Sequence, residues 1–216
     1  VDPNNPRVSN AIYGNRHRII GTMNKTWTYG DADKWSTTVS LFFEAAQGGR
    51  FSYTYAGDAN GDGSFLNDLI YIPNTGELQT YQFSGNAQQQ EAQRNAFENY
   101  ISQDTYLKDR RGQYAERYAN LSPWFSRLDI RALQDLNLMG NQSIQFSMDI
   151  LNFGNLFNNS WGVREGVNNT QPISIAVDPA TQIPTYTFDE SQTSSFVDDF
   201  SLNSRWQIQF GLRYNF

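Results

Sequence analysis

Oxygen-bearing side chains alternate in residues 57–73, GDANGDGSFLNDLIYIP. Asp58, Asn60 and Asp62 occupy every second position, and Gly63 follows them. This spacing matches the front half of a calcium loop, where alternating oxygens converge on the ion and the glycine permits a sharp turn. The predicted ligands of a Ca²⁺ ion are Asp58, Asn60, Asp62, Ser64 through its carbonyl oxygen, and Asp68.

The second half of this stretch departs from the calcium pattern. The twelfth position, which a bidentate glutamate normally fills, is Leu69, and the nearest acid is Asp68. The residues before the loop, YTY at 53–55, read as a strand and not as the helix that precedes an EF-hand loop. A turn built from Asp and Gly without any ion explains the same residues, so both interpretations stay open.

The sequence offers little support for other metal sites, for catalysis or for nucleic-acid binding. There is no cysteine and a single histidine, His17, which argues against thiolate and multi-histidine metal sites. No G-x-S-x-G, P-loop or H-E-x-x-H motif occurs, so we expect no enzyme, although a glycosidase-like carboxylate pair in the loops stays open. The net charge of −6 argues against nucleic-acid binding, which needs a basic face.

Composition points to a membrane protein of a particular kind. No apolar run approaches the ~18 residues of a membrane-spanning helix, and the first residues, VDPNNPRVSN, lack the pattern of a signal peptide. Yet aromatic residues make up 15% of the chain and charged residues only 18%. Outer-membrane barrels combine these properties, because their strands are short and only half apolar.

Alternation of apolar and polar residues is the strongest structural signal. In RWQIQFGLRYNF, every second residue from Trp206 onward is apolar or aromatic: Trp206, Ile208, Phe210, Leu212, Tyr214 and Phe216. Because successive strand residues point to opposite faces, this segment predicts a strand with one apolar and one polar face. Four other segments show similar patterns, so the predicted strands lie near 17–29, 34–47, 124–138, 142–155 and 203–216. Lys25 is an exception on the apolar side. A soluble β-sandwich also alternates in this way.

Connection lengths favour the barrel over the sandwich. The first two strands are joined by GDADK and the next two by little more than MGN. Segments 56–122 and 157–201 are much longer, which fits short periplasmic turns and long extracellular loops. Trp27, Tyr29 and Trp35 with Tyr214 and Phe216, and at the other side Phe51, Trp124 and Trp206, would form two aromatic girdles.

Five strands cannot close a barrel, since the smallest have about eight. The predicted fold is therefore all-β, an antiparallel transmembrane β-barrel segment of a larger barrel. The charged residues predicted to face its lumen are Glu44, Arg127, Asp129, Arg131, Asp135, Asp149 and Arg213. They would line a ligand path or contact a plug, or simply form a water-filled, charge-paired wall.

The first long segment is expected to contain a surface helix. Ala96, Phe97, Tyr100 and Ile101 stand at helical spacing, and Gly85–Asn86 is a plausible start. Aromatic residues of the loops, such as Tyr106, Tyr114, Tyr118 and Trp161, would stack on a ligand or pack the loops together.

Several segments together resemble the C-terminal β-barrel portion of TonB-dependent outer-membrane receptors, in particular the Oar-like receptors with a carboxypeptidase-regulatory-like extension found in Bacteroidota. They are GDANGDG…NDLIYIP, FENYISQDTYLKDRRGQYAERYANLSPWFSRLDIRALQDL, SIQFSMDILNFGNLFNNSWG and WQIQFGLRYNF, and the resemblance covers the chain from about Arg16 to Phe216. It implies a barrel of about 22 strands and an N-terminal plug domain in the parent receptor. Ligand uptake would be driven by a TonB-type energy transducer.

The same resemblance implies partners and a location. Outer-membrane lipid, the plug, the remaining barrel strands and the outer-membrane assembly machinery would contact this chain, and a surface lipoprotein is a further candidate. The implied assembly signal is the aromatic last strand, with Trp206, Phe210, Tyr214 and Phe216. The location would be the bacterial outer membrane, with the two long loops extracellular and the C-terminus periplasmic. Two alternatives stay open: a surface adhesin or scaffold, and a soluble, calcium-stabilised β-domain.

Overall fold

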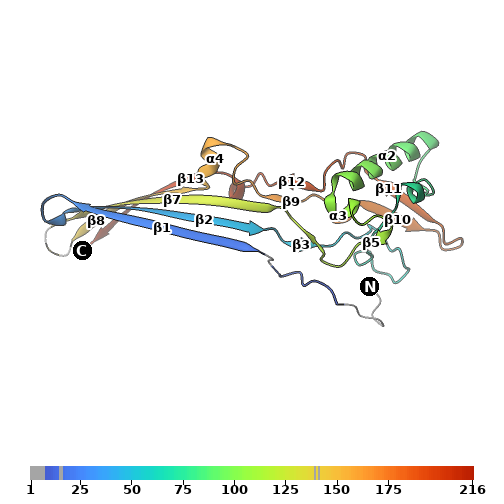
Figure 1. Cartoon of the computed structure of the whole chain (residues 1–216), viewed down its shortest axis with the longest axis horizontal. Helices are drawn as coiled ribbons and strands as arrows, with labels where there is room; N and C mark the ends of the chain where they lie inside the picture. The colour runs from blue at the N-terminus through green and yellow to red at the C-terminus, as the bar shows by residue number, and fades with distance from the viewer. Residues whose placement is uncertain (1–7, 15–16, 139, 141) are drawn as a thin grey trace. The chain divides into compact units, whose positions relative to one another are not determined.

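The computed structural model describes residues 8–14, 17–138, 140 and 142–216. The chain divides into two compact units, each assembled from separate stretches. Within the described residues, the loop unit comprises 8–14, 49–122 and 166–197, and the sheet unit comprises 17–48, 123–165 and 198–216. The sheet unit is built on long antiparallel strands, and the loop unit is built from helices and short strands around a hydrophobic core. Figure 1 labels the elements of both units.

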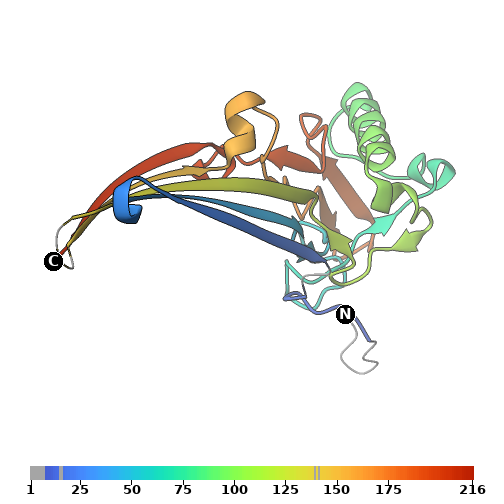
Figure 2. The same cartoon turned by 60° about the vertical axis from the view of Figure 1, so that its left-hand side comes forward.

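The sheet unit is built on one antiparallel sheet of five long strands. In sheet order these are β1 (Arg18–Tyr29), β2 (Trp35–Gln47), β7 (Trp124–Asn137), β8 (Ser143–Leu151) and β13 (Gln207–Asn215). The strands lie side by side in Figure 1, and Figure 2 shows them curving together. The prediction of a mostly β chain with antiparallel strands is confirmed.

The pairing register separates the residues of this sheet into an apolar and a polar face. Register partners continue across all five strands, as in Met23–Leu41–Ile130–Ile150–Ile208. The apolar face carries Ile19, Met23, Trp27, Tyr29, Trp35, Val39, Leu41, Phe43, Leu128, Ile130, Ala132, Leu136, Ile144, Phe146, Met148, Ile150, Ile208, Phe210, Leu212 and Tyr214. Lys25 belongs to this face too, so the exception noted in the sequence is real.

Two tight connections link neighbouring strands at one end of the sheet. Between β1 and β2 the chain passes through a short 3-10 turn, η1 (Asp31–Asp33), which follows Gly30 at φ +84°. Between β7 and β8, the amide of Leu138 donates to the carbonyl of Gln142 at 2.9 Å. The short-connection pattern expected from the sequence is confirmed for both strand pairs.

Two predicted strand ends need correction. The fourth strand ends at Leu151 and not near 155, because Asn152 adopts a left-handed conformation (φ +52°) and starts α4 (Phe153–Phe157). The last strand begins at Gln207 and not near 203, because η2 (Leu202–Ser204) precedes it. In η2 the side chain of Ser201 caps the turn by accepting from the amide of Asn203.

The loop unit has a hydrophobic core of its own. Its longest element is α2 (Ala87–Gln103), which buries Phe97, Tyr100 and Ile101. Asn86 caps this helix by accepting from the amide of Gln89, which confirms the predicted helix and its start. The remaining elements are β3 (Arg50–Phe51), β4 (Tyr71–Ile72), α1 (Thr75–Leu78), α3 (Thr105–Lys108), β5 (Gln113–Tyr114), β6 (Asn120–Leu121), β10 (Ile173–Val177) and β11 (Pro184–Phe188). A further pair, β9 (Glu165–Val167) with β12 (Phe196–Asp198), lies where the two units meet in the sequence.

Segments far apart in the sequence hold the loop unit together. The hairpin β10–β11 joins the earlier segment through bridges Ala56–Ser174 and Phe83–Tyr186. The amide of Thr54 also donates to the carbonyl of Thr170 at 2.9 Å. The two long connections are therefore one folded body. Phe51, expected in an aromatic girdle, lies instead in its core, with 7% of its surface exposed.

Among the described residues, no helix has both the length and the apolar character needed to cross a membrane.

Candidate ligand-binding site

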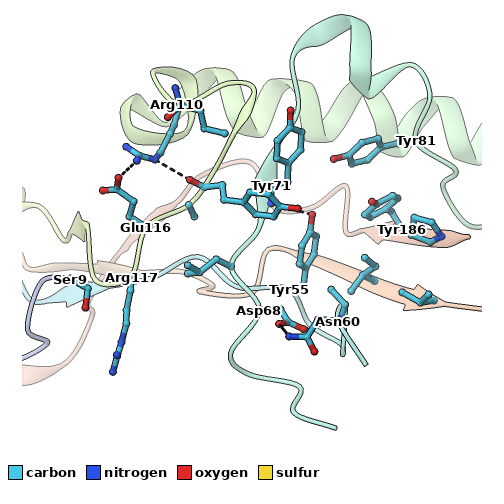
Figure 3. A pocket seen from close by; sticks show the side chains of 18 of the residues that line it. Ser9, Tyr55, Asn60, Asp68, Tyr71, Tyr81, Arg110, Glu116, Arg117 and Tyr186 are labelled. Carbon is cyan, nitrogen blue, oxygen red and sulfur yellow. Dashed lines mark hydrogen bonds and ion pairs between the residues drawn. The ribbon is translucent and has the colours of Figure 1, made fainter. Parts of the chain in front are cut away.

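A cavity of about 1410 Å³ opens in the loop unit. Its walls come from β4, β5, the β10–β11 hairpin, the acidic stretch around Asp68 and the N-terminal segment at 8–10. Figure 3 shows the side chains of most lining residues converging on this space. Because its walls join segments more than a hundred residues apart in sequence, the cavity depends on the folded loop unit.

Five tyrosines give the cavity its chemical character: Tyr55, Tyr71, Tyr81, Tyr114 and Tyr186. Tyr81 and Tyr186 stack with ring centres 4.2 Å apart and planes 13° apart. Tyr71 meets Tyr114 edge to face at 5.2 Å. Tyr55 and Tyr186 are buried, Tyr71 and Tyr81 are half-buried, and Tyr114 is 64% exposed.

Burial further favours the neutral form of three of these phenol groups. It raises the pKa of Tyr55, Tyr81 and Tyr186 above the usual tyrosine value. The Tyr55 hydroxyl accepts a hydrogen bond from the amide of Tyr71 at 3.2 Å (Figure 3). At neutral pH these groups therefore offer hydroxyls and ring faces, and no negative charge.

The two arginines of the cavity differ in their partners. Arg110 forms an ion pair with Glu116 and donates to the carbonyl of Tyr114 at 3.1 Å (Figure 3). Arg117 lies 5.0 Å from the ring centre of Tyr118. In the described part of the chain it forms no ion pair, so its charge is available to a ligand.

The acidic loop beside the cavity is organised by its own backbone. The carboxylate of Asp58 accepts from the amides of Gly61, Asp62 and Gly63 at 2.6, 3.2 and 2.8 Å. Positive φ angles of 77° and 84° at Gly61 and Gly63 make this tight course possible. The predicted calcium ligand Asp58 thus already serves as the acceptor at the centre of a turn.

The remaining predicted calcium ligands also contact one another. Asn60 donates to Asp62 at 3.2 Å and to the buried Asp68 at 2.7 Å, and Asp62 accepts from the amide of Ser64 at 2.8 Å. The Ser64 amide first, then the Asn67 and Asn60 side chains, lower the pKa of Asp62. Within the described residues, no group of three or more carboxylate or imidazole side chains is arranged to hold a metal ion. Calcium binding here stays a prediction.

All seven residues predicted to face a lumen share the polar face of the sheet. Glu44 binds Arg18 at 2.7 Å and Arg127 at 3.6 Å, and Arg127 also approaches Asp129 at 3.4 Å. The ion pairs and hydrogen bonds extend to Arg131–Asp149 and Gln145–Asp135. In the described part of the chain, Arg213 has no ion pair.

The residues of the predicted assembly signal lie together at one edge of the sheet. Phe210 and Tyr214 belong to β13, and Trp206 and Phe216 flank it. Their exposed fractions are 43% for Trp206, 63% for Phe210, 51% for Tyr214 and 95% for Phe216. These four side chains are therefore accessible, and their role as an assembly signal stays a prediction.

The sequence interpretation missed most of the tyrosine wall. Of the loop aromatics proposed for stacking, Tyr114 lines the cavity, whereas Tyr106 and Tyr118 pack beneath Arg110 and Arg117. Trp161 lines a second, smaller cavity in the sheet unit. The alternating run YTY at 53–55 was the available signal for Tyr55, because alternate strand residues share a face.

Comparison with protein-family models, with curated proteins and with solved structures gave no match to this chain.

Proposed function

We propose that this chain forms part of the transmembrane β-barrel of an outer-membrane, TonB-dependent receptor that takes up a ligand. The observation that carries the proposal is the continuous apolar face of the five-stranded sheet. Its large apolar residues include Met23, Phe210 and Leu212, which are 65%, 63% and 78% exposed. A face of this extent requires an apolar surrounding, and the lipid of a bilayer supplies one.

The polar groups on that face support the same surrounding. Thr37 donates to the side-chain oxygen of Gln134 at 2.6 Å, and the hydroxyl of Tyr29 reaches the same oxygen at 3.1 Å. Polar groups in contact with lipid must find partners inside the protein, because hydrocarbon offers none. Tyr29 and Trp35, beside the tight turn, are suited to the interface between lipid and water.

The two edges of the sheet support its being part of a larger barrel. In the described part of the chain, β1 and β13 each pair with one neighbour only. An open edge within a membrane leaves backbone N–H and C=O groups unsatisfied, so further strands must pair with both. We propose that these strands come from the remainder of the same receptor, together with a plug domain and a TonB-type energy transducer.

The loop unit would then be the extracellular part of the receptor. Its cavity suits the first capture of a ligand, and the ion-paired polar face of the sheet suits the water-filled wall of a barrel. The assembly machinery would recognise the aromatic strand β13, and a surface lipoprotein remains a proposed partner. The chain would contribute binding and passage, and no chemistry.

Membrane fractionation tests this proposal directly. We expect the protein in the outer-membrane fraction, resistant to high salt and recovered only with detergent. Recovery of folded protein in the aqueous phase without detergent would contradict the membrane assignment and favour a soluble β-domain.

A surface adhesin or scaffold is the second candidate, and the independent core of the loop unit favours it. Deleting the proposed plug region of the parent protein separates the two. An energised importer loses ligand uptake, whereas an adhesin keeps its surface binding. Expression and heat stability of the truncated barrel serve as the control for correct assembly.

A further inference from the structure

We infer that the cavity of the loop unit binds an oligosaccharide that carries an acidic group. The inference rests on the proposed function, because it names the class of ligand that the receptor would capture. It is drawn from the size of the cavity, its accessible aromatic rings, its neutral polar groups and its one available cation.

The size of the cavity indicates a ligand of several units. Sites for small molecules usually enclose about 300–1,000 Å³, and this cavity measures about 1410 Å³. One sugar ring would leave most of the tyrosine wall without contact. A chain of a few rings can reach both the Tyr71–Tyr114 pair and the Tyr81–Tyr186 stack.

The aromatic rings are arranged to receive flat, partly apolar faces. Tyr114 is 64% exposed, and Tyr71 and Tyr81 are half-buried. Buried Tyr186 supports Tyr81 from behind at 4.2 Å, which holds that ring in a fixed orientation (Figure 3). The electron-rich face of a tyrosine attracts positively polarised C–H groups. One face of a pyranose ring presents such groups, while its hydroxyls point outward to other partners.

Neutral hydrogen-bonding groups surround these rings. The side chains of Ser9, Asn10 and Gln113 line the cavity and are exposed. In the described part of the chain, none of the three has a hydrogen-bonding partner for its side chain. Amides and hydroxyls both donate and accept, which matches the dual character of sugar hydroxyls.

The charges of the lining argue for a single acidic group on the ligand. Glu116 neutralises Arg110, and Asp68 is occupied by Asn60 and by the amide of Ala59 at 2.7 Å. Arg117 is therefore the available cation, and it points away from the Arg110–Glu116 pair in Figure 3. A polyanionic ligand such as a metal chelate would need several such groups. A carboxylate or sulfate on one sugar needs only this one.

The test compares two probes: tetragalacturonate that is methyl-esterified on all but one of its carboxylates, and the fully methyl-esterified form. They differ by a single negative charge and the methyl group that removes it. Binding to the detergent-solubilised protein is measured by isothermal titration calorimetry. We expect the acid to bind about tenfold more tightly than the ester, as one charge-assisted hydrogen bond predicts. Arg117→Gln should remove this preference and leave binding of the ester unchanged. Arg205→Gln, at an exposed position of the sheet unit, is the matched control.

Tyrosine variants test the stacking contacts separately. Tyr114→Ala should weaken binding of both probes by about five- to tenfold. Tyr13→Ala changes a 95% exposed tyrosine outside the cavity and should leave both affinities unchanged. Both positions are exposed, so we expect these variants to fold, which thermal unfolding verifies.

Three results would overturn the inference: no binding of either probe to folded protein, equal affinity for acid and ester, or tighter binding of a tetrapeptide of the same charge. Fractionation distinguishes this failure from failure of the proposed function. A detergent-dependent protein that binds neither probe refutes only the ligand class. A water-soluble protein that binds them refutes only the membrane receptor.

Discussion

The sheet unit and the loop unit place their apolar residues in opposite ways. The loop unit buries Tyr53, Ile70 and Ile72 completely, at 0% exposure, in a single core. The sheet unit keeps Phe210 and Leu212 more than 60% exposed on one face. Burial against protein stabilises a unit in water, whereas an exposed apolar face is favourable only against another apolar phase. One chain thus combines a unit with a buried core and a unit with an exposed apolar face, and the second is the unit that we propose lies in lipid.

Polar side chains also have different roles in the two units. In the loop unit they end helices and close turns, as Asn86, Asp104 and Asp58 do. In the sheet unit several charged residues pair across strands on one face, as Glu44 does with Arg18 and Arg127. In the loop unit these residues hold the local backbone in place. In the sheet unit the ion pairs neutralise charges on the polar face of the sheet. The predictions below test this contrast, from the largest expected effect to the smallest.

Phe97→Ala should destabilise the loop unit with or without detergent. Phe97 is 1% exposed, with ring centres of Phe188 and Phe83 at 5.2 and 6.5 Å. Truncating a buried phenylalanine costs about 3–5 kcal/mol. Hydrogen exchange of α2 amides measures the loss, and Phe65→Ala, at a 63% exposed phenylalanine, is the control. Equal exchange in both variants would argue against a self-contained core.

Phe210→Arg should disrupt the sheet unit only in a bilayer. Phe210 lies on the apolar face of β13, and Gln209 beside it lies on the polar face. Arginine facing the bilayer midplane costs about 2–4 kcal/mol. The measurement is urea unfolding in lipid vesicles, with Gln209→Arg as the matched control. If both variants unfold alike, the two faces do not meet different solvents.

Asp104→Ala should weaken the loop unit to a smaller extent. Asp104 is buried, accepts from the Tyr53 hydroxyl at 2.7 Å and caps α3 through the amide of Leu107 at 3.0 Å. Its loss leaves buried donors without an acceptor, at a cost of about 1–3 kcal/mol. Thermal unfolding of the variant measures this. A parallel Asp109→Ala variant, at the other end of α3, should change little.

Acid should loosen the acidic loop through Asp62. The pKa of Asp62 is lowered in the folded protein, chiefly by the amide of Ser64. Its contribution is therefore present above the unfolded pKa of about 3.9 and is lost as pH falls through the lower folded value. Limited proteolysis of residues 57–73 across this pH range should show the change in the wild type. An equal response in Asp62→Asn would assign it to another group.

Calcium should protect the same loop against proteolysis, and a chelator should remove the protection. Asp58→Ala abolishes the calcium response, because it removes the first predicted ligand. Cleavage that is identical with calcium and with chelator would leave the loop as an Asp–Gly turn that holds itself through Asp58 and its three amide donors. Asp178→Ala, in the β10–β11 turn, controls for general loosening of acidic turns.

Much of the sheet was predictable because its signal is local. Alternation around Ile208 and Phe210 needs only the two-residue period of a strand, and the register then confirmed which residues share a face. Helix α2 was predictable from Asn86 and the spacing of Phe97 and Tyr100. The misplaced end of the fourth strand came from Asn152, whose left-handed conformation is a single-residue feature that alternation does not report.

The sequence by itself determined the alternating strands, their tight turns, the capped helix and the acidic turn, since each depends on neighbours a few residues away. Only the tertiary structure decided that Phe51 belongs to a core and that two long connections form one body. The tyrosine cavity is likewise a tertiary feature. Tyr71, Tyr114 and Tyr186 meet because β4 pairs with β5 and residue 83 bridges to 186. Contacts between such distant segments follow from packing of the whole unit, which no local pattern in the chain records.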